Sequence, residues 1–93
     1  MTRLVWDASF KRAMKQIART NPGLYERIFE TLATLEQDPF LPKLRTHKLR
    51  GQLEGLWACS VTYDCRVVFS FEPGTQDQPV ILLVDVGTHE DVY

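Results

Sequence analysis

The sequence predicts an α+β domain in which an N-terminal strand and a two-helix hairpin precede a three-stranded antiparallel meander. Apolar residues recur at the helical period in two consecutive segments of the first half, whereas they alternate at the strand period in the second half. The apolar side of a sheet needs cover, and the apolar helix stripes are the cover available. We therefore expect one antiparallel sheet with both helices on one face and the other face partly open.

The first helix is expected to begin near Ala8. The run Arg3–Trp6 before it is strand-like, and Asp7 suits the N-cap position. Apolar residues in this segment recur with the spacing i, i+3, i+4, i+7, and the lysines and arginines lie mostly off that stripe. This pattern predicts an amphipathic helix. This stripe consists of Phe10, Ala13, Met14 and Ile17.

A second helix is expected after the break at 20–23. Asn21 suits its N-cap and Pro22 its first position, and the apolar pattern stops at Asp38 and Pro39. The two helices should then form a hairpin. The face expected to be buried carries Leu24, Tyr25, Ile28, Phe29, Leu32 and Leu35.

The second half reads as strands. Segment 40–46 contains proline and has no clear period, so we expect an ordered loop there. Three strands are then expected, at 56–61, 65–71 and 80–86, with a tight turn at 62–64 and a Gly/Pro loop at 72–79. One face of the middle strand carries Cys65, Val67, Phe69 and Phe71, and the opposite face carries Arg66, Val68 and Ser70.

Residues 1–93 are expected to form a single domain, because 93 residues is the length of one core. The composition, with 44% apolar and 25% charged residues, is that of an ordinary globular protein. No apolar run approaches the roughly 18–20 residues that span a bilayer, and the N-terminus lacks the layout of a signal peptide. The sequence therefore predicts a cytoplasmic protein without a membrane partner.

The two cysteines, Cys59 and Cys65, flank the predicted turn and could face each other across the hairpin. In a reducing cytosol we expect them to pack in the core rather than form a disulfide. The only histidines are His47 and His89, and their spacing to the cysteines matches no zinc site. Neither a metal nor another cofactor is predicted.

Charge is distributed unevenly along the chain. Residues 1–50 hold ten basic and five acidic residues, a net of +5, whereas residues 51–93 carry one basic and seven acidic residues, a net of −6. A basic first half suits phosphate or an acidic partner, but helices that display solvated charges would give the same count.

Arg66 is the most informative single residue. A charge in the middle of a strand, between Cys65 and Val67, is tolerated only where it reaches solvent, a carboxylate or a bound anion. Two interpretations remain open: Arg66 binds an anion, or it forms an ion pair with Asp64 or Asp85.

Four strings along the chain resemble the RelE/ParE toxins of toxin–antitoxin systems in order and spacing. They are H-K-L-R-G at 47–51, G-L-W at 55–57, Y-D-C-R-V-V-F at 63–69 and V-G-T-H-E-D-V-Y at 86–93. The terminal G-T-H with an aromatic last residue is similar to the YafQ branch in particular. The resemblance covers essentially the whole chain and implies a RelE/ParE-like fold and a ribosome-dependent mRNA endonuclease that inhibits translation.

Cleavage through the 2′-hydroxyl needs a base for that hydroxyl, stabilisation of the phosphate's charge and an acid for the 5′-oxygen, but no obligatory metal. The resemblance implies that His47 takes the proton and that Arg66 holds the phosphate. It implies that His89 is the general acid or positions the phosphate, that Tyr93 stacks on a base and that Asp64 belongs to the site. A structural role stays open for four of these residues. His47 could bond to the backbone, and His89 could simply be exposed. Tyr93 could close the core, and Asp64 could be an ordinary turn residue.

A basic patch is expected to accompany these five residues. It would contact rRNA or mRNA phosphates, or dock an acidic antitoxin segment. Its members are Lys43, Arg45, Lys48 and Arg50.

Three positions depart from the YafQ pattern. Ser60 stands where YafQ-like toxins have a second histidine, and Cys65 stands where they have tryptophan. Asp85 replaces an arginine that would stabilise the transition state. Two other functions therefore stay open: a ParE-like inhibitor that binds DNA gyrase, and a toxin fold with decayed catalysis that still binds its antitoxin. All three functions imply an antitoxin partner that covers the open sheet face and strand edges.

Overall fold

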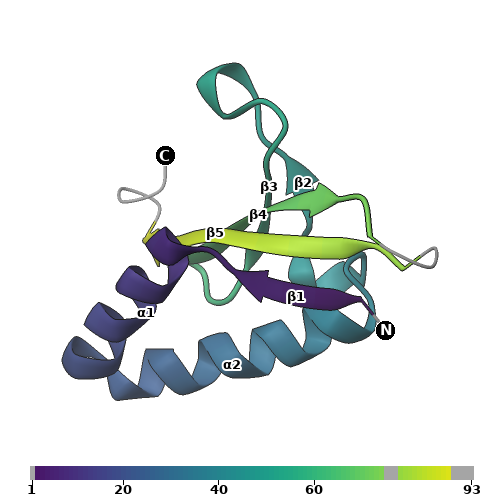
Figure 1. The fold of residues 1–93 in the computed structure, drawn as a ribbon. Coiled ribbons are helices and arrows are strands. Elements are labelled where there is room, and N and C mark those ends of the chain that lie inside the picture. The colour runs from purple at the N-terminus through teal and green to yellow at the C-terminus, as the bar shows by residue number, and fades with distance from the viewer. Residues whose placement is uncertain (1, 75–77, 89–93) are drawn as a thin grey trace.

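The computed structural model describes residues 2–74 and 78–88, and within them it contains a five-stranded mixed sheet with two helices on one face (Figure 1). The strand order is β1-β5-β4-β3-β2. In chain order the elements are β1 (Arg3–Trp6), α1 (Ala8–Thr20), α2 (Pro22–Gln37), η1 (Pro42–Leu44), β2 (His47–Lys48), η2 (Gly51–Leu53), β3 (Trp57–Ser60), β4 (Cys65–Glu72) and β5 (Val80–Thr88), where η marks a 3₁₀ helix. The α+β class, the helix hairpin on one face and the antiparallel meander β3–β4–β5 are confirmed.

Local capping explains where the two helices meet. The Asn21 side chain accepts a hydrogen bond of 3.2 Å from the Leu24 amide, and Pro22 is the first residue of α2, as predicted. Asp7 precedes α1, but its side chain makes no capping hydrogen bond. Its carboxylate instead accepts from the Ser9 hydroxyl at 2.8 Å, and that hydrogen bond lowers the pKa of Asp7.

The expectation of a purely antiparallel sheet was wrong. β1 pairs in parallel with β5, with Arg3 opposite Val80 and Trp6 opposite Leu83. Antiparallel pairing is imposed only where a tight turn joins two strands, and β1 is joined to the sheet through the two helices. β5 therefore lies between β1 and β4, which accounts for its nearly continuous apolar sequence.

The strand β2 was not predicted. It consists of His47 and Lys48, which pair with Ala58 and Trp57 of β3. Two residues are too few to show an alternating pattern, so the sequence carried no signal for it. The segment 40–46, predicted as an ordered loop, contains the 3₁₀ helix η1.

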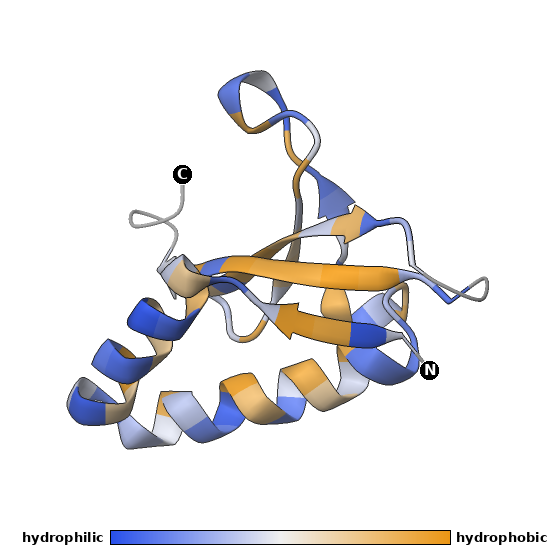
Figure 2. Cartoon of the chain, in the orientation of Figure 1, coloured by the Kyte–Doolittle hydropathy of each residue, from blue (hydrophilic) through white to orange (hydrophobic). Residues whose placement is uncertain are grey.

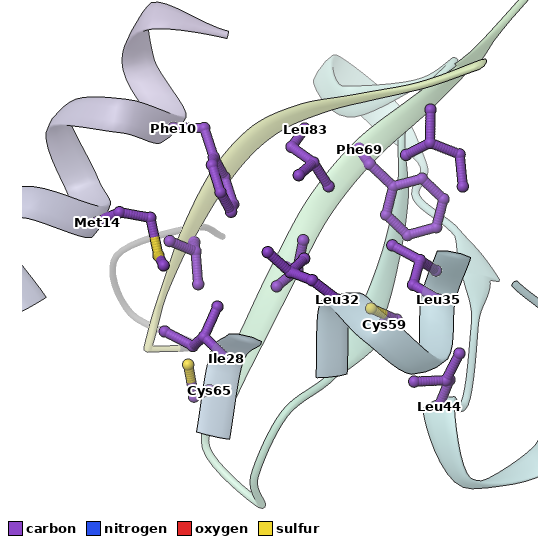
Figure 3. Close-up of a cluster of buried hydrophobic side chains, with 13 residues drawn as sticks. Phe10, Met14, Ile28, Leu32, Leu35, Leu44, Cys59, Cys65, Phe69 and Leu83 are labelled. Carbon is purple, nitrogen blue, oxygen red and sulfur yellow. The ribbon is translucent and has the colours of Figure 1, made fainter. Parts of the chain in front are cut away.

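The main core lies between the helices and the sheet. Figure 2 shows apolar residues along the strands and on the helix surfaces that face them. In Figure 3, Phe10 and Met14 of α1 and Ile28, Leu32 and Leu35 of α2 gather against side chains of the sheet. The sheet contributes Cys59, Cys65, Val67, Phe69, Ile81, Leu83 and Val86.

Two expectations about this core need correction or refinement. Phe29 was expected to be buried, but 42% of its surface is exposed, and its ring lies against Tyr25 and Trp6 at the helix surface. Cys59 and Cys65 are buried free thiols, as predicted, but Cys59 pairs with Val67 rather than facing Cys65. Burial raises the pKa of Cys59 to about 12 and that of Cys65 to about 11.

The opposite face of the sheet is partly covered, as expected. Leu49, Ala58 and Val68 form a small buried cluster there, and Leu53 and Leu56 from the segment between β2 and β3 pack against it. This segment projects beyond the sheet in Figure 1. Cys59 and Val67 are core residues, so their strand neighbours Ser60 and Arg66 belong to this second face. Among residues 2–74 and 78–88, no helix is long and apolar enough to cross a membrane.

Candidate functional site

A cavity of about 730 Å³ lies where the end of β3 meets the segment that precedes β2. Three of its lining side chains are cationic and a fourth is a histidine, so positive charge dominates the wall. The lining residues are Lys43, Arg45, His47, Ser60, Val61, Thr62, Tyr63 and Arg66.

The position of the cavity follows from strand lengths. β2 pairs only with Ala58 and Trp57, so it does not extend along the second half of β3. Before the start of β2, the 3₁₀ helix η1 approaches β3 and brings Lys43 and Arg45 to that edge. Ser60, the last residue of β3, lies directly opposite Arg66 of β4. Segments distant in sequence therefore supply one basic cavity.

His47 is exposed on the wall of the cavity, and its ring orientation is defined. Nδ1 lies 2.9 Å from the Arg45 carbonyl oxygen. A carbonyl oxygen can only accept, so in the neutral ring Nδ1 carries the hydrogen. In this tautomer Nε2 is the ring nitrogen without a hydrogen, which is the nitrogen that a general base uses.

Arg45 holds this histidine through an unusual backbone conformation. With φ 50° and ψ 41° it is left-handed, and it is the only non-glycine residue with positive φ in the part of the chain that the structure describes. Such a conformation costs on the order of 1 kcal/mol or more and is typical of functional sites. The left-handed conformation of Arg45 ends η1, and the Arg45 amide donates a hydrogen bond to the Pro42 carbonyl.

Arg66 lies in the middle of the sheet and is half-buried. It pairs with Ser60 on one side and with Gly87 of β5 on the other, and Gly87 adds no side chain beside the guanidinium. Asp85 lies two residues earlier in β5, opposite Val68, and its carboxylate accepts a 2.8 Å hydrogen bond from the Val86 amide. The acidic residue that departs from the YafQ pattern is thus close to the site along β5.

Asp64 lies in the exposed turn between β3 and β4, outside the set of cavity-lining residues. Its carboxylate accepts a 3.1 Å hydrogen bond from the Thr62 hydroxyl. Its neighbour Tyr63 lines the cavity and is fully exposed. Tyr63 was not among the predicted site residues, because a tyrosine in a polar turn gives no signal until the turn is seen to border a basic cavity.

The predicted basic patch consists of two parts. Lys43 and Arg45 line the cavity, whereas Lys48 and Arg50 line a second hollow, of about 990 Å³, on the other side of β2. Alternation explains the division, since Lys48 points to the face opposite that of its neighbour His47. His47 borders both hollows.

The two remaining predicted site residues, His89 and Tyr93, lie outside the described residues. The last described residue of β5, Thr88, is opposite Cys65, the neighbour of Arg66. No group of three or more His, Cys, Asp or Glu side chains suited to a metal ion occurs within residues 2–74 and 78–88.

This arrangement can bind and activate a phosphodiester. Three cationic side chains line one cavity, Lys43 and Arg45 from the η1 segment and Arg66 from β4, and this favours a multiply charged anion. The lining also includes a histidine, the side chain that most often transfers protons in catalysis. An exposed tyrosine at the rim offers a flat surface of the kind on which nucleobases stack.

Solved structures of bacterial toxins share this fold. The chain is similar to a YoeB/ParE toxin from Agrobacterium tumefaciens (TM-score 0.77, 22% identity, covering 95% of this chain and 99% of that one). It is similar to YafQ from E. coli (TM-score 0.78, 13% identity, 100% and 99% covered). It also matches YafQ in the E. coli DinJ–YafQ toxin–antitoxin complex (TM-score 0.76, 16% identity, 100% and 99% covered). At these identities the likeness establishes the fold.

The sequence itself assigns the family. Residues 2–93 match the family described as "Bacterial toxin of type II toxin-antitoxin system, YafQ". No curated protein sequence matches the chain. The chain therefore belongs to the YafQ family of toxins within the RelE/ParE superfamily, as the four strings predicted.

Proposed function

We propose that this toxin is an endoribonuclease that cleaves mRNA in the A site of the ribosome, without a metal ion. The observation that carries the proposal is the cavity that Lys43, Arg45 and Arg66 line together with His47. A phosphate bound there is held by three cations and lies beside an imidazole with the correct tautomer for a base. Membership of the YafQ family supports the same activity.

The proposed reaction is a transfer of the phosphate to a neighbouring oxygen. Nε2 of His47 takes the proton of the 2′-hydroxyl, and the 2′-oxygen attacks phosphorus. The bond to the 5′-oxygen breaks, which leaves a 2′,3′-cyclic phosphate and a 5′-hydroxyl. Arg66 stabilises the charge that develops on the phosphoryl oxygens. His89 supplies the proton to the 5′-oxygen, a role that rests on the G-T-H string.

Aromatic and polar residues complete the proposed substrate site. Tyr63 and Tyr93 stack on bases next to the scissile phosphate, and Asp64 orients the turn through Thr62. Lys48 and Arg50, beyond β2, contact phosphates of the mRNA or the ribosome.

We further propose that an antitoxin protein silences the enzyme. The YafQ and RelBE2 structures solved as toxin–antitoxin complexes support this assignment. A bound antitoxin would cover the basic cavity, and the cations there favour an acidic segment. Co-expression with the protein encoded beside this toxin should give a stable complex and restore growth.

Induced expression of the wild type, Arg66→Ala and His89→Ala, followed by primer extension on a translated reporter mRNA, tests the nuclease. Wild type should cut only while the message is translated, and both variants should lose the cuts. Lys15→Ala is the matched control, because it removes an exposed cation from α1 and should cut like wild type.

Other outcomes would move the protein to another function. Growth arrest with intact mRNA would contradict the nuclease and favour a gyrase inhibitor. A harmless protein that still binds its antitoxin would indicate decayed catalysis, which Asp85 near the site and Ser60 opposite Arg66 favour.

A further inference from the structure

Three aromatic rings form a surface platform at the β2 edge of the sheet. Phe40 follows α2, Trp57 begins β3 and Phe71 is near the end of β4. Phe40 and Phe71 are nearly parallel, with an interplanar angle of 15° and centroids 5.7 Å apart. Trp57 meets both edge-on, at 5.6 Å from Phe40 and 5.2 Å from Phe71.

Packing against the core accounts for two of these rings but leaves the third largely exposed. Trp57 and Phe71 contact the main core, but Phe40 is not part of it, and 57% of its surface is exposed. A single exposed aromatic is common, but an exposed ring that extends a cluster of partly exposed aromatics is typical of a binding site. Phe40 therefore presents a flat apolar surface to solvent.

Positive charge accompanies the rings. Lys48 Nζ lies 5.5 Å above the ring of Trp57. Trp57 and Phe71 line the second hollow together with Lys48 and Arg50, and Glu54 is the one acidic residue in that lining. Flat aromatic surfaces interleaved with cations bind single-stranded nucleic acid, because bases stack on the rings while phosphates pair with the cations.

The platform is continuous with the proposed active site. His47 borders both hollows, and β2 is the edge strand between them, with Arg66 on the open face of the sheet and the rings of Trp57 and Phe71 on the side of the main core. A nucleotide step is about as long as two strand residues, roughly 6–7 Å. A strand of RNA that leaves the cavity can therefore cross β2 and place its next bases on the platform.

We propose that Phe40, Trp57, Phe71 and Lys48 form a stacking site for a nucleobase of single-stranded RNA that flanks the scissile phosphate. This site rests on the proposed function, since it extends the path of the same RNA. It gives the enzyme a contact with a base that the catalytic residues do not touch.

Two measurements on the free protein test the site. The probe is a short single-stranded 2′-O-methyl oligoribonucleotide, which lacks the hydroxyl required for cleavage. In a Trp6→Phe background, Trp57 is the remaining tryptophan, so quenching of its emission reports a base on the platform. Fluorescence anisotropy of a labelled probe gives the Kd independently.

We expect saturable quenching, and a Kd raised about tenfold in Phe40→Ala because one stacking contact is lost. Phe40→Tyr should bind like the parent, since it keeps the ring. Lys48→Gln should weaken binding and lower its dependence on salt. Phe29→Ala is the matched control, because Phe29 is also a partly exposed aromatic but lies on α2 beside Trp6 and Tyr25.

The outcomes separate this site from the nuclease. mRNA cleavage on translating ribosomes without any quenching of Trp57 would overturn the stacking site and leave the nuclease intact. Quenching that depends on Phe40 in a protein that cuts no mRNA would support the stacking site and contradict the nuclease. If Phe40→Ala weakened only antitoxin binding, the platform would be a protein contact and the proposal would be wrong.

Discussion

At the scale of single residues, the backbone around His47 and Arg66 restricts what each side chain can do. The Arg45 carbonyl accepts a hydrogen bond from Nδ1 of His47, which fixes the tautomer of the neutral ring. Arg66 is the second residue of β4, where it is paired with Ser60 on one side and Gly87 on the other. The sequence predicted the face on which Arg66 lies, because Cys65 and Val67 on either side are core residues. It could not predict the tautomer of His47.

Replacement of His47 by glutamine should slow mRNA cleavage by roughly 10²- to 10⁴-fold, the range for loss of a general base. Glutamine keeps a donor for the Arg45 carbonyl but cannot accept the 2′-hydroxyl proton. Single-turnover cleavage on translating ribosomes measures the effect, with Lys15→Gln as control. An unchanged rate in His47→Gln would exclude the base assignment, and growth arrest should weaken in step with the rate.

At the scale of secondary-structure elements, short segments decide the shape of the site. β2 begins only at His47, opposite Ala58, and η1 supplies Lys43 and Arg45 to the edge of β3 that β2 leaves uncovered. Helices and long strands could be predicted from periodicity. A two-residue strand and a one-turn 3₁₀ helix carry no period, so their place depends on the partners they meet.

The helix α2 should depend on its cap. Asn21→Ala removes the acceptor for the Leu24 amide and should lower the free energy of unfolding by about 1 kcal/mol. For a domain of this size that corresponds to a fall in Tm of about 4–8 °C. Thermal unfolding followed by circular dichroism measures it, and Asn21→Asp, which keeps an acceptor oxygen, should retain the wild-type Tm. Equal losses in both variants would argue against the cap.

At the scale of the whole molecule, one core holds all elements in register. Side chains from both helices meet those of β3, β4 and β5 (Figure 3), and the cavity lies at the margin of this core. The two cysteines are part of that packing. Their pKa values of about 12 and 11 mean that almost no thiolate is present near neutral pH.

Thiol reactivity should therefore report global unfolding. At pH 8, iodoacetamide should leave Cys59 and Cys65 unmodified in the folded protein and alkylate both in denaturant, because burial raises each pKa and unfolding removes the burial. Intact-mass spectrometry counts the modified thiols across a urea series. The modification midpoint should coincide with the unfolding midpoint from circular dichroism. Rapid labelling without denaturant would show that the sheet opens locally.

The sequence by itself determined the α+β class, both helices with the cap at Asn21, the antiparallel meander and the face of Arg66, because these follow from local periodicity and capping. Only the tertiary structure decided that β1 pairs in parallel with β5, that β2 begins beside a basic cavity, and that Lys48 lies apart from Lys43. Which strands pair, and which side chains meet at the cavity, depends on packing between segments that are distant in the chain. Local sequence patterns do not encode which distant segments come together.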